Sequence, residues 1–220
     1  MDIPALFKFL KGLKKNNNKE WFEKHREEYN GLRKEFTALV NEIIQELAKA
    51  DPEIANLEAK DCIFRINRDI RFSKDKTPYK TNFGASIAPG GKKGVLPGYY
   101  LHLEPGASFL AGGKYMPDAQ ELKKIRQEID YNGEQLEKIL KGKNFKKYFG
   151  EMYQEDKLTN PPKEYNKTHP QIELLKLKSF IVVHDMGDEV VASKDFKKYY
   201  KKIYAEMLPL NHFLREALSS

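Results

Sequence analysis

The sequence predicts an α+β fold, in which a mainly antiparallel sheet of about four or five strands is covered by a long N-terminal helix and later helices. Three observations lead to this prediction. Apolar residues recur every three or four positions before residue 50, alternate between residues 62 and 113, and return to helical spacing after residue 117. Because no repeat, low-complexity tract or linker divides the chain, we expect residues 1–220 to form a single domain.

The N-terminal region predicts two helices. Asp2 before Pro4 is typical of a capped short helix over residues 3–13. A long amphipathic helix should follow up to about residue 50, with Asn17 and Glu20 at its N-terminal cap. Its apolar stripe, which we expect to lie in the core, comprises Trp21, His25, Tyr29, Leu32, Phe36, Leu39, Ile43 and Leu47.

Short segments rich in β-branched and aromatic residues predict the strands. They are CIFRI at 62–66, TNFGASIA at 81–88, GYYLHLE at 98–104, ASFLAGG at 107–113 and the buried strand SFIVVHDM at 179–186. Pro105 and Gly106 stand at the central positions of a type II turn, so we expect the third and fourth segments to form a hairpin. Pro117 and Asp118 should open helices through about residue 150, and the tail from residue 193 should be helical again.

Composition narrows the class of protein. The chain has 40% hydrophobic and 32% charged residues, which suits a globular protein rather than a disordered one. A single cysteine, Cys62, excludes an internal disulfide and fits a reducing compartment. No apolar run reaches the length of a membrane span, and the first residues lack the order of a signal peptide. We therefore expect a cytoplasmic protein without a membrane partner.

The net charge of +7 is concentrated in one stretch of the chain. Residues 65–93 include eight basic residues but only two acidic residues, Asp69 and Asp75. The other lysines are interleaved with acids on predicted helices and are best interpreted as solvated faces. If residues 63–72 formed one strand, Arg68 would enter an apolar face, and it would then need a carboxylate, carbonyls or a bound anion. A turn after Arg68 is equally compatible with the sequence.

The same stretch carries a motif, Arg65-x-x-Arg68-Asp69-x-Arg71-Phe72-x-x-Asp75-Lys76-x-Pro78-Tyr79-Lys80. This motif resembles the signature of a widespread bacterial family of conserved hypothetical proteins, classed only as a domain of unknown function. Residues elsewhere fit the same family: 18–22, 100–106, 112–117, 162–165 and 169–170. The resemblance covers nearly the whole chain. It implies one conserved single-domain unit and no particular activity.

The residue types in the motif favour an anion-binding site. Planar guanidinium groups and lysine point charges bind phosphate or carboxylate, and two acids do not neutralise six cations. The predicted ligand-binding residues are Arg65, Arg68, Asp69, Arg71, Lys76, Tyr79 and Lys80. The ligand would be an anionic small molecule, a nucleotide or a nucleic-acid phosphate. A structural alternative is an ion-pair network in which Asp69, Asp75 and Glu104 tie this segment to the sheet.

An enzymatic alternative rests on residues outside the motif. His102 and Glu104 alternate with Tyr100 on one strand face and could move protons beside a phosphorylated or carboxylated substrate. His184 with Asp185 is a second possible acid–base or metal pair, but no recognised ligand spacing is present, so no metal site is predicted. We interpret Cys62 as an inert buried thiol. Whether a reaction occurs, which cofactor it would use and the oligomeric state are left open by the sequence.

Overall fold

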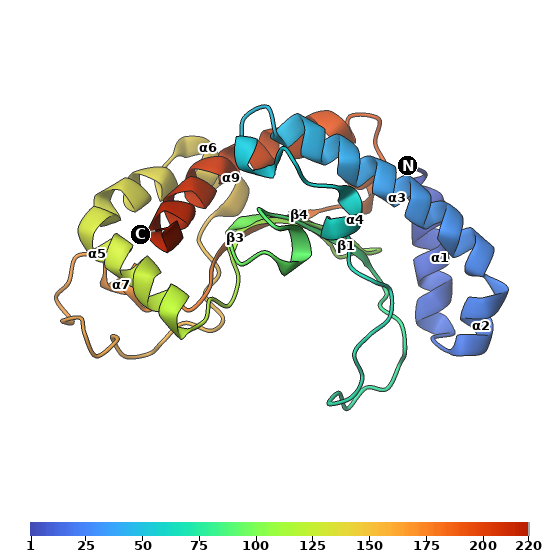
Figure 1. Ribbon diagram of the computed structural model, residues 1–220, viewed down its shortest axis with the longest axis horizontal. Helices are drawn as coiled ribbons and strands as arrows, with labels where there is room; N and C mark the ends of the chain where they lie inside the picture. Colours follow the sequence, from blue (N-terminus) through green and yellow to red (C-terminus); the bar gives the residue numbers. More distant parts are fainter. Residues whose placement is uncertain (220) are drawn as a thin grey trace. The chain divides into compact units, whose positions relative to one another are not determined.

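A computed structural model describes residues 1–219, and the chain packs into two compact units (Figure 1). The first unit consists of Met1–Gly94, Tyr100–Leu110 and Asp185–Lys201. The second consists of Val95–Tyr99, Ala111–His184 and the residues from 202 onward. The single domain over residues 1–220 stays a prediction.

Four antiparallel strands form one sheet in the order β1-β2-β3-β4, which confirms the predicted α+β class. The strands are β1 (Phe83–Ile87), β2 (Gly98–Leu103), β3 (Ser108–Lys114) and β4 (Phe180–Met186). The predicted hairpin joins β2 to β3: the Ala107 N–H donates to the Glu104 carbonyl at 3.0 Å, and Gly106 adopts the positive φ of 74° that this turn requires. Along β2, Leu101 and Leu103 are buried and the intervening residues lie on the other face.

The helices of the first unit begin with α1 (Ile3–Lys15), whose cap is Asp2 as predicted. The predicted long helix is two helices, α2 (Lys19–Lys24) and α3 (Arg26–Leu47), which lie beside α1 in Figure 1. His25 separates them, because its backbone leaves the helical region (φ −111°, ψ 15°) and its ring stacks on Trp21. His25 is half-buried rather than a core residue. The N-cap is Asn18, not Asn17, and accepts a hydrogen bond from the Trp21 N–H.

The predicted strand at 62–66 is not a named strand of the sheet. Ala59–Cys62 is a short helix, α4, and Ile63 contributes an isolated bridge to Ala85. Beside this bridge, the Phe64 N–H donates to the Gly84 carbonyl at 3.0 Å. Three further short helices belong to this unit: η1 (Pro52–Ile54), η2 (Gly91–Lys93) and α8 (Asp188–Val191).

The second unit is built on the helices predicted after Pro117. They are α5 (Ala119–Leu140), α6 (Lys143–Phe149), α7 (Ile172–Leu175) and the larger part of α9 (Phe196–Ser219). Asp118 forms a capping box with Glu121 at the start of α5. Apolar side chains of α5, Ile125, Ile129 and Leu136, are fully buried. None of the helices within residues 1–219 is long and apolar enough to cross a membrane.

Candidate functional site

The basic motif forms a long loop, residues 65–80, that projects from the rest of the first unit near β1 (Figure 1). We call it the basic loop. Its two arms are paired near the base: the Lys80 N–H donates to the Ile66 carbonyl at 2.8 Å, and the Arg68 N–H donates to the Pro78 carbonyl at 2.9 Å. The chain therefore turns back after Arg68, as one of the two sequence interpretations required.

Arg68 is held by groups of the loop itself. Its guanidinium forms an ion pair with Asp75 and donates to the Thr77 hydroxyl, as well as to the Thr77 carbonyl at 3.3 Å. Asp75 also accepts the Thr77 N–H at 2.9 Å. This backbone hydrogen bond, together with those from the side chains of Arg68 and Thr77, lowers the pKa of Asp75 to about 2. Arg68 thus connects the two arms of the loop through its side chain.

The outer part of the loop uses two further cations in the same way. Arg71 makes two hydrogen bonds to Asp69, at 3.0 and 2.7 Å, which lower the pKa of that carboxyl. Lys76 donates from Nζ to the Ile70 carbonyl at 2.9 Å. Both acids of the loop are therefore paired with arginines of the same loop rather than with the sheet.

Tyr79 anchors the returning arm. Its ring is 6% exposed and stacks on Phe22 with 4.1 Å between ring centres, and burial raises the pKa of its hydroxyl. Asn17 binds the Tyr79 backbone from both sides: it donates to the carbonyl at 2.9 Å and accepts the N–H at 3.0 Å. Asn17 is therefore committed to a residue 62 positions away, which explains why it does not cap α2.

Arg65 and Lys80 lie at the base of the loop and differ from the other cations. Lys80 is half-buried, with Nζ 5.2 Å from the centre of the Phe64 ring. Burial lowers the pKa of Lys80, and the positive charge of Arg65 lowers it further. Within residues 1–219 neither side chain makes a hydrogen bond or an ion pair to an acid. The base of the loop therefore holds two neighbouring positive charges that are not ion-paired, although the charge of Arg65 contributes to the lowered pKa of Asp69.

Beside this base, polar side chains form a line across the sheet face of β2. Tyr100, His102 and Glu104 occupy alternate positions, so they lie on one face. His102 Nε2 is 3.1 Å from Glu104 Oε2, and the Tyr100 hydroxyl is 3.4 Å from His102 Nδ1. Glu104 also accepts the Thr81 hydroxyl at 2.8 Å. We call these four residues the β2 line.

The β2 line is fixed by packing. The Phe109 ring stacks on His102 at 4.5 Å between ring centres, which holds the imidazole plane. A Cβ added at Gly84 would lie 2.5 Å from the Tyr100 hydroxyl, so only glycine leaves room for that group. Phe64 contacts both Tyr100, at 6.2 Å between ring centres, and Lys80. The β2 line and the cation pair therefore belong to one part of the first unit.

A comparison with protein families fits these observations. Residues 5–213 match the family described as conserved hypothetical protein (DUF2461). The chain belongs to this family. No curated protein and no solved structure gave a match. Membership of the DUF2461 family agrees with the resemblance seen in the sequence and brings no activity with it, so the function must be argued from the geometry of this member.

The remaining sequence candidates lie elsewhere. His184 Nδ1 is 2.8 Å from the Tyr148 carbonyl in the second unit, and Asp185 is exposed. Cys62 is fully buried, and burial raises the pKa of its thiol to about 11, so the thiolate is scarce at neutral pH. These surroundings do not distinguish His184 or Cys62 as reactive groups.

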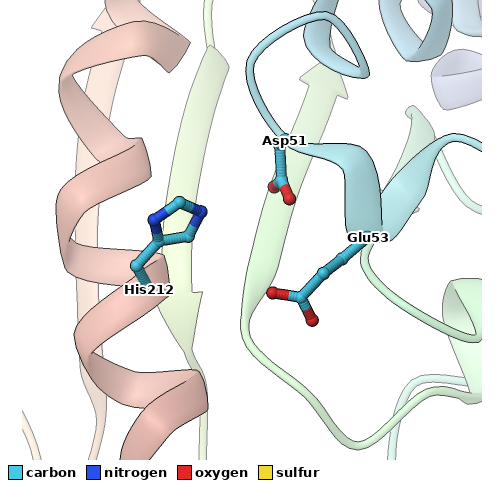
Figure 2. A group of neighbouring side chains, drawn as sticks. All are labelled: Asp51, Glu53 and His212. Carbon is cyan, nitrogen blue, oxygen red and sulfur yellow. The ribbon is translucent and has the colours of Figure 1, made fainter.

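Figure 2 shows three side chains that the sequence did not single out. Asp51, which is 1% exposed, and Glu53 lie at η1 in the first unit, and His212 lies on α9 in the second. Asp51 and Glu53 each have an interaction partner already. Neighbouring acids at a helix start are common, so we assign these residues no functional role.

Proposed function

We propose that this member of the DUF2461 family binds a small anionic ligand, bearing phosphate or carboxylate, at the base of the basic loop. Arg65 and Lys80 would contact the anion, while Arg68, Asp69, Arg71, Lys76 and Tyr79 hold the loop in place. The observation that carries the proposal is that, within residues 1–219, neither of these two neighbouring cations makes an ion pair or hydrogen bond to an acid. Burial lowers the pKa of Lys80 and repulsion by Arg65 lowers it further, and a negative charge between the two cations would relieve that repulsion.

The test compares melting temperatures in phosphate and in chloride at matched ionic strength. A ligand at about 100 times its Kd stabilises a protein by about 2.7 kcal/mol. For a chain of this length that corresponds to a rise in Tm of roughly 5–10 °C. We expect wild type to gain stability in phosphate and Arg65→Gln and Lys80→Met to lose most of the gain.

Arg71→Gln is the matched control for Arg65→Gln. Both substitutions remove one exposed arginine from the same loop, but the Arg71 charge is already balanced by Asp69. Arg71→Gln should therefore keep the response to phosphate. An equal response from all four proteins, or none in wild type, would refute anion binding at this base.

The β2 line favours a second candidate function, an enzyme acting on the same class of ligand. If the imidazole of His102 carries its hydrogen on Nε2, it donates to Glu104 and accepts from the Tyr100 hydroxyl. When the Tyr100 oxygen accepts a proton from a ligand, its own proton would pass to His102 Nδ1, and the Glu104 carboxylate would stabilise the imidazolium that forms. Such an arrangement suits general acid–base catalysis beside a bound anion.

This candidate is tested by incubating the protein with a panel of phosphorylated and carboxylated small molecules and following them by NMR. We expect turnover of at least one compound and a loss of about 100-fold or more in His102→Gln, the usual contribution of a general acid or base. His184→Gln removes another strand histidine and should retain full activity. Equal turnover in both variants would exclude a catalytic role for His102.

A further inference from the structure

The tip of the basic loop presents an aromatic side chain to solvent. Phe72 is 95% exposed, and the only contact described for its ring is the Arg71 guanidinium, 5.8 Å from the ring centre. Leaving a phenylalanine in water forgoes about 1.5–3 kcal/mol of burial free energy, so its position calls for a partner. The Arg68 and Lys76 contacts on either side fix the loop that carries it. The ring is therefore presented by a preorganised segment.

The charge around Phe72 is positive. Between Arg65 and Lys76 five cations face two acids, an excess of three. Both acids are paired with arginines of the loop. Lys74 is exposed and, within residues 1–219, has no hydrogen bond or ion pair of its side chain. Lys76 binds a carbonyl, so its charge is not neutralised. A partner at the tip should therefore be anionic.

The same tip argues against two classes of partner. A protein interface needs an apolar centre of several side chains, and the other exposed large apolar residue of the first unit is Met1, at 39%. Stable membrane attachment requires two binding elements, such as a large apolar surface together with a polybasic patch. The loop tip has one exposed phenylalanine and a small excess of cations, which is weak on both counts. Single-stranded nucleic acid binds through aromatic stacking on bases together with cations along the backbone. The tip offers both.

We propose that the tip of the basic loop binds single-stranded nucleic acid, with Phe72 stacked on a base and Lys74 and Lys76 near the adjoining phosphates. This function goes beyond the anion site, because Arg65 and Lys80 lie at the base of the loop and Phe72 at its tip. It requires no sequence preference, since every base has an aromatic face.

The experiment measures fluorescence anisotropy of a labelled 15-nucleotide oligo-dT and a matching oligo-U at low and rising salt. We expect Phe72→Ala to weaken binding about 5- to 150-fold, the loss that one base–aromatic stack represents, and Phe72→Trp to restore it. Lys74→Gln should reduce the slope of log K against log salt by about 0.7, the value for one phosphate on a single strand. Tyr131→Ala is the control, because Tyr131 is also exposed, at 71%, but lies outside the loop.

Several outcomes would overturn the proposal. They are the absence of binding at low ionic strength, equal affinity of wild type and Phe72→Ala, and an equal loss in Tyr131→Ala. If the protein binds phosphatidylserine vesicles but no oligonucleotide, and Phe72→Ala abolishes the vesicle binding, the loop tip has a membrane role instead of a nucleic-acid role. Thermal shifts in phosphate separate this test from the anion site: Phe72→Ala should keep the phosphate response, and Lys80→Met should keep oligonucleotide binding.

Discussion

Arg68 and Lys80 belong to the same basic loop, yet their surroundings differ. Arg68 meets Asp75 and Thr77 of the opposite arm, so its charge is balanced within the loop. Lys80 meets the Phe64 ring and the like charge of Arg65, and burial and that charge lower its pKa. One basic motif therefore contains cations that hold the loop together and cations that, within residues 1–219, have no ion pair. The following predictions test this difference, from the largest expected effect to the smallest.

The largest effect should come from Gly84→Ala, which disturbs the β2 line without changing a charge. The new Cβ would lie 2.5 Å from the Tyr100 hydroxyl, so the ring or the strand must move, at a cost of about 1–3 kcal/mol. Urea denaturation measures the loss, and ring chemical shifts report the movement of Tyr100. Gly31→Ala is the control: no atom lies within 4 Å there, and alanine should stabilise α3 by about 1 kcal/mol. Wild-type stability of Gly84→Ala would show that Tyr100 does not depend on this space.

Arg68→Ala should destabilise the protein by about 1 kcal/mol, because it removes hydrogen bonds that join the two arms. The ion pair itself contributes little, since the side chains of Arg68 and Asp75 are 27% and 58% exposed. Arg71→Ala should change the free energy of unfolding by less than about 0.5 kcal/mol, because its pair with Asp69 is more exposed and spans two residues. The urea midpoints of Arg68→Ala and Arg71→Ala, compared with wild type, measure the two losses of stability. Equal losses would remove the special role of Arg68.

Lys80→Met should stabilise the protein at pH 7 by up to about 0.5 kcal/mol, because methionine keeps the packing on Phe64 and removes a repelling charge. The pKa of Lys80 is lowered in the folded state from the ordinary 10.5. At pH values between the lowered pKa of the folded state and 10.5, Lys80 is protonated in the unfolded chain but not in the folded chain. The stability of wild type therefore rises with pH in that range. The advantage of the variant should therefore vanish above pH 10.5. Lys93→Met, which removes an exposed lysine outside the loop, is the control and should change the free energy of unfolding by less than about 0.5 kcal/mol.

The smallest effect concerns Asp75 and acid. Its folded pKa of about 2 lies below the ordinary 3.8, so its contribution to stability is complete above 3.8 and is lost as the pH falls through about 2. The Thr77 amide, which donates to Asp75, reports this step by NMR. Asp75→Asn should abolish the step, and Arg68→Ala should move its midpoint upward. A wild-type midpoint near 3.8 would contradict the network.

Local sequence signals predicted much of the fold. Period-two alternation placed Tyr100 and His102 on one face of β2, with Glu104 directly after the strand, and proline with glycine after Glu104 predicted the hairpin. Helical spacing predicted the long N-terminal helical region but not its interruption at His25, where a side-chain contact with Trp21 competes with the helical backbone. The strand expected at 62–66 failed because helix α4 takes its first residue and the chain leaves the sheet soon after Ile63.

The sequence by itself determined which residue types gather in the motif and which side chains share a strand face, because periodicity reports local geometry. It did not determine which cation meets which acid. Only the reversal of the loop brings Asp75 to Arg68, and only the sheet brings Thr81 to Glu104, 23 positions away. Within residues 1–219, Arg65 and Lys80 form no ion pair, because both acids of the loop are paired with other arginines. Such pairings depend on tertiary structure, since an ion pair forms between groups that are close in space, whatever their separation along the chain.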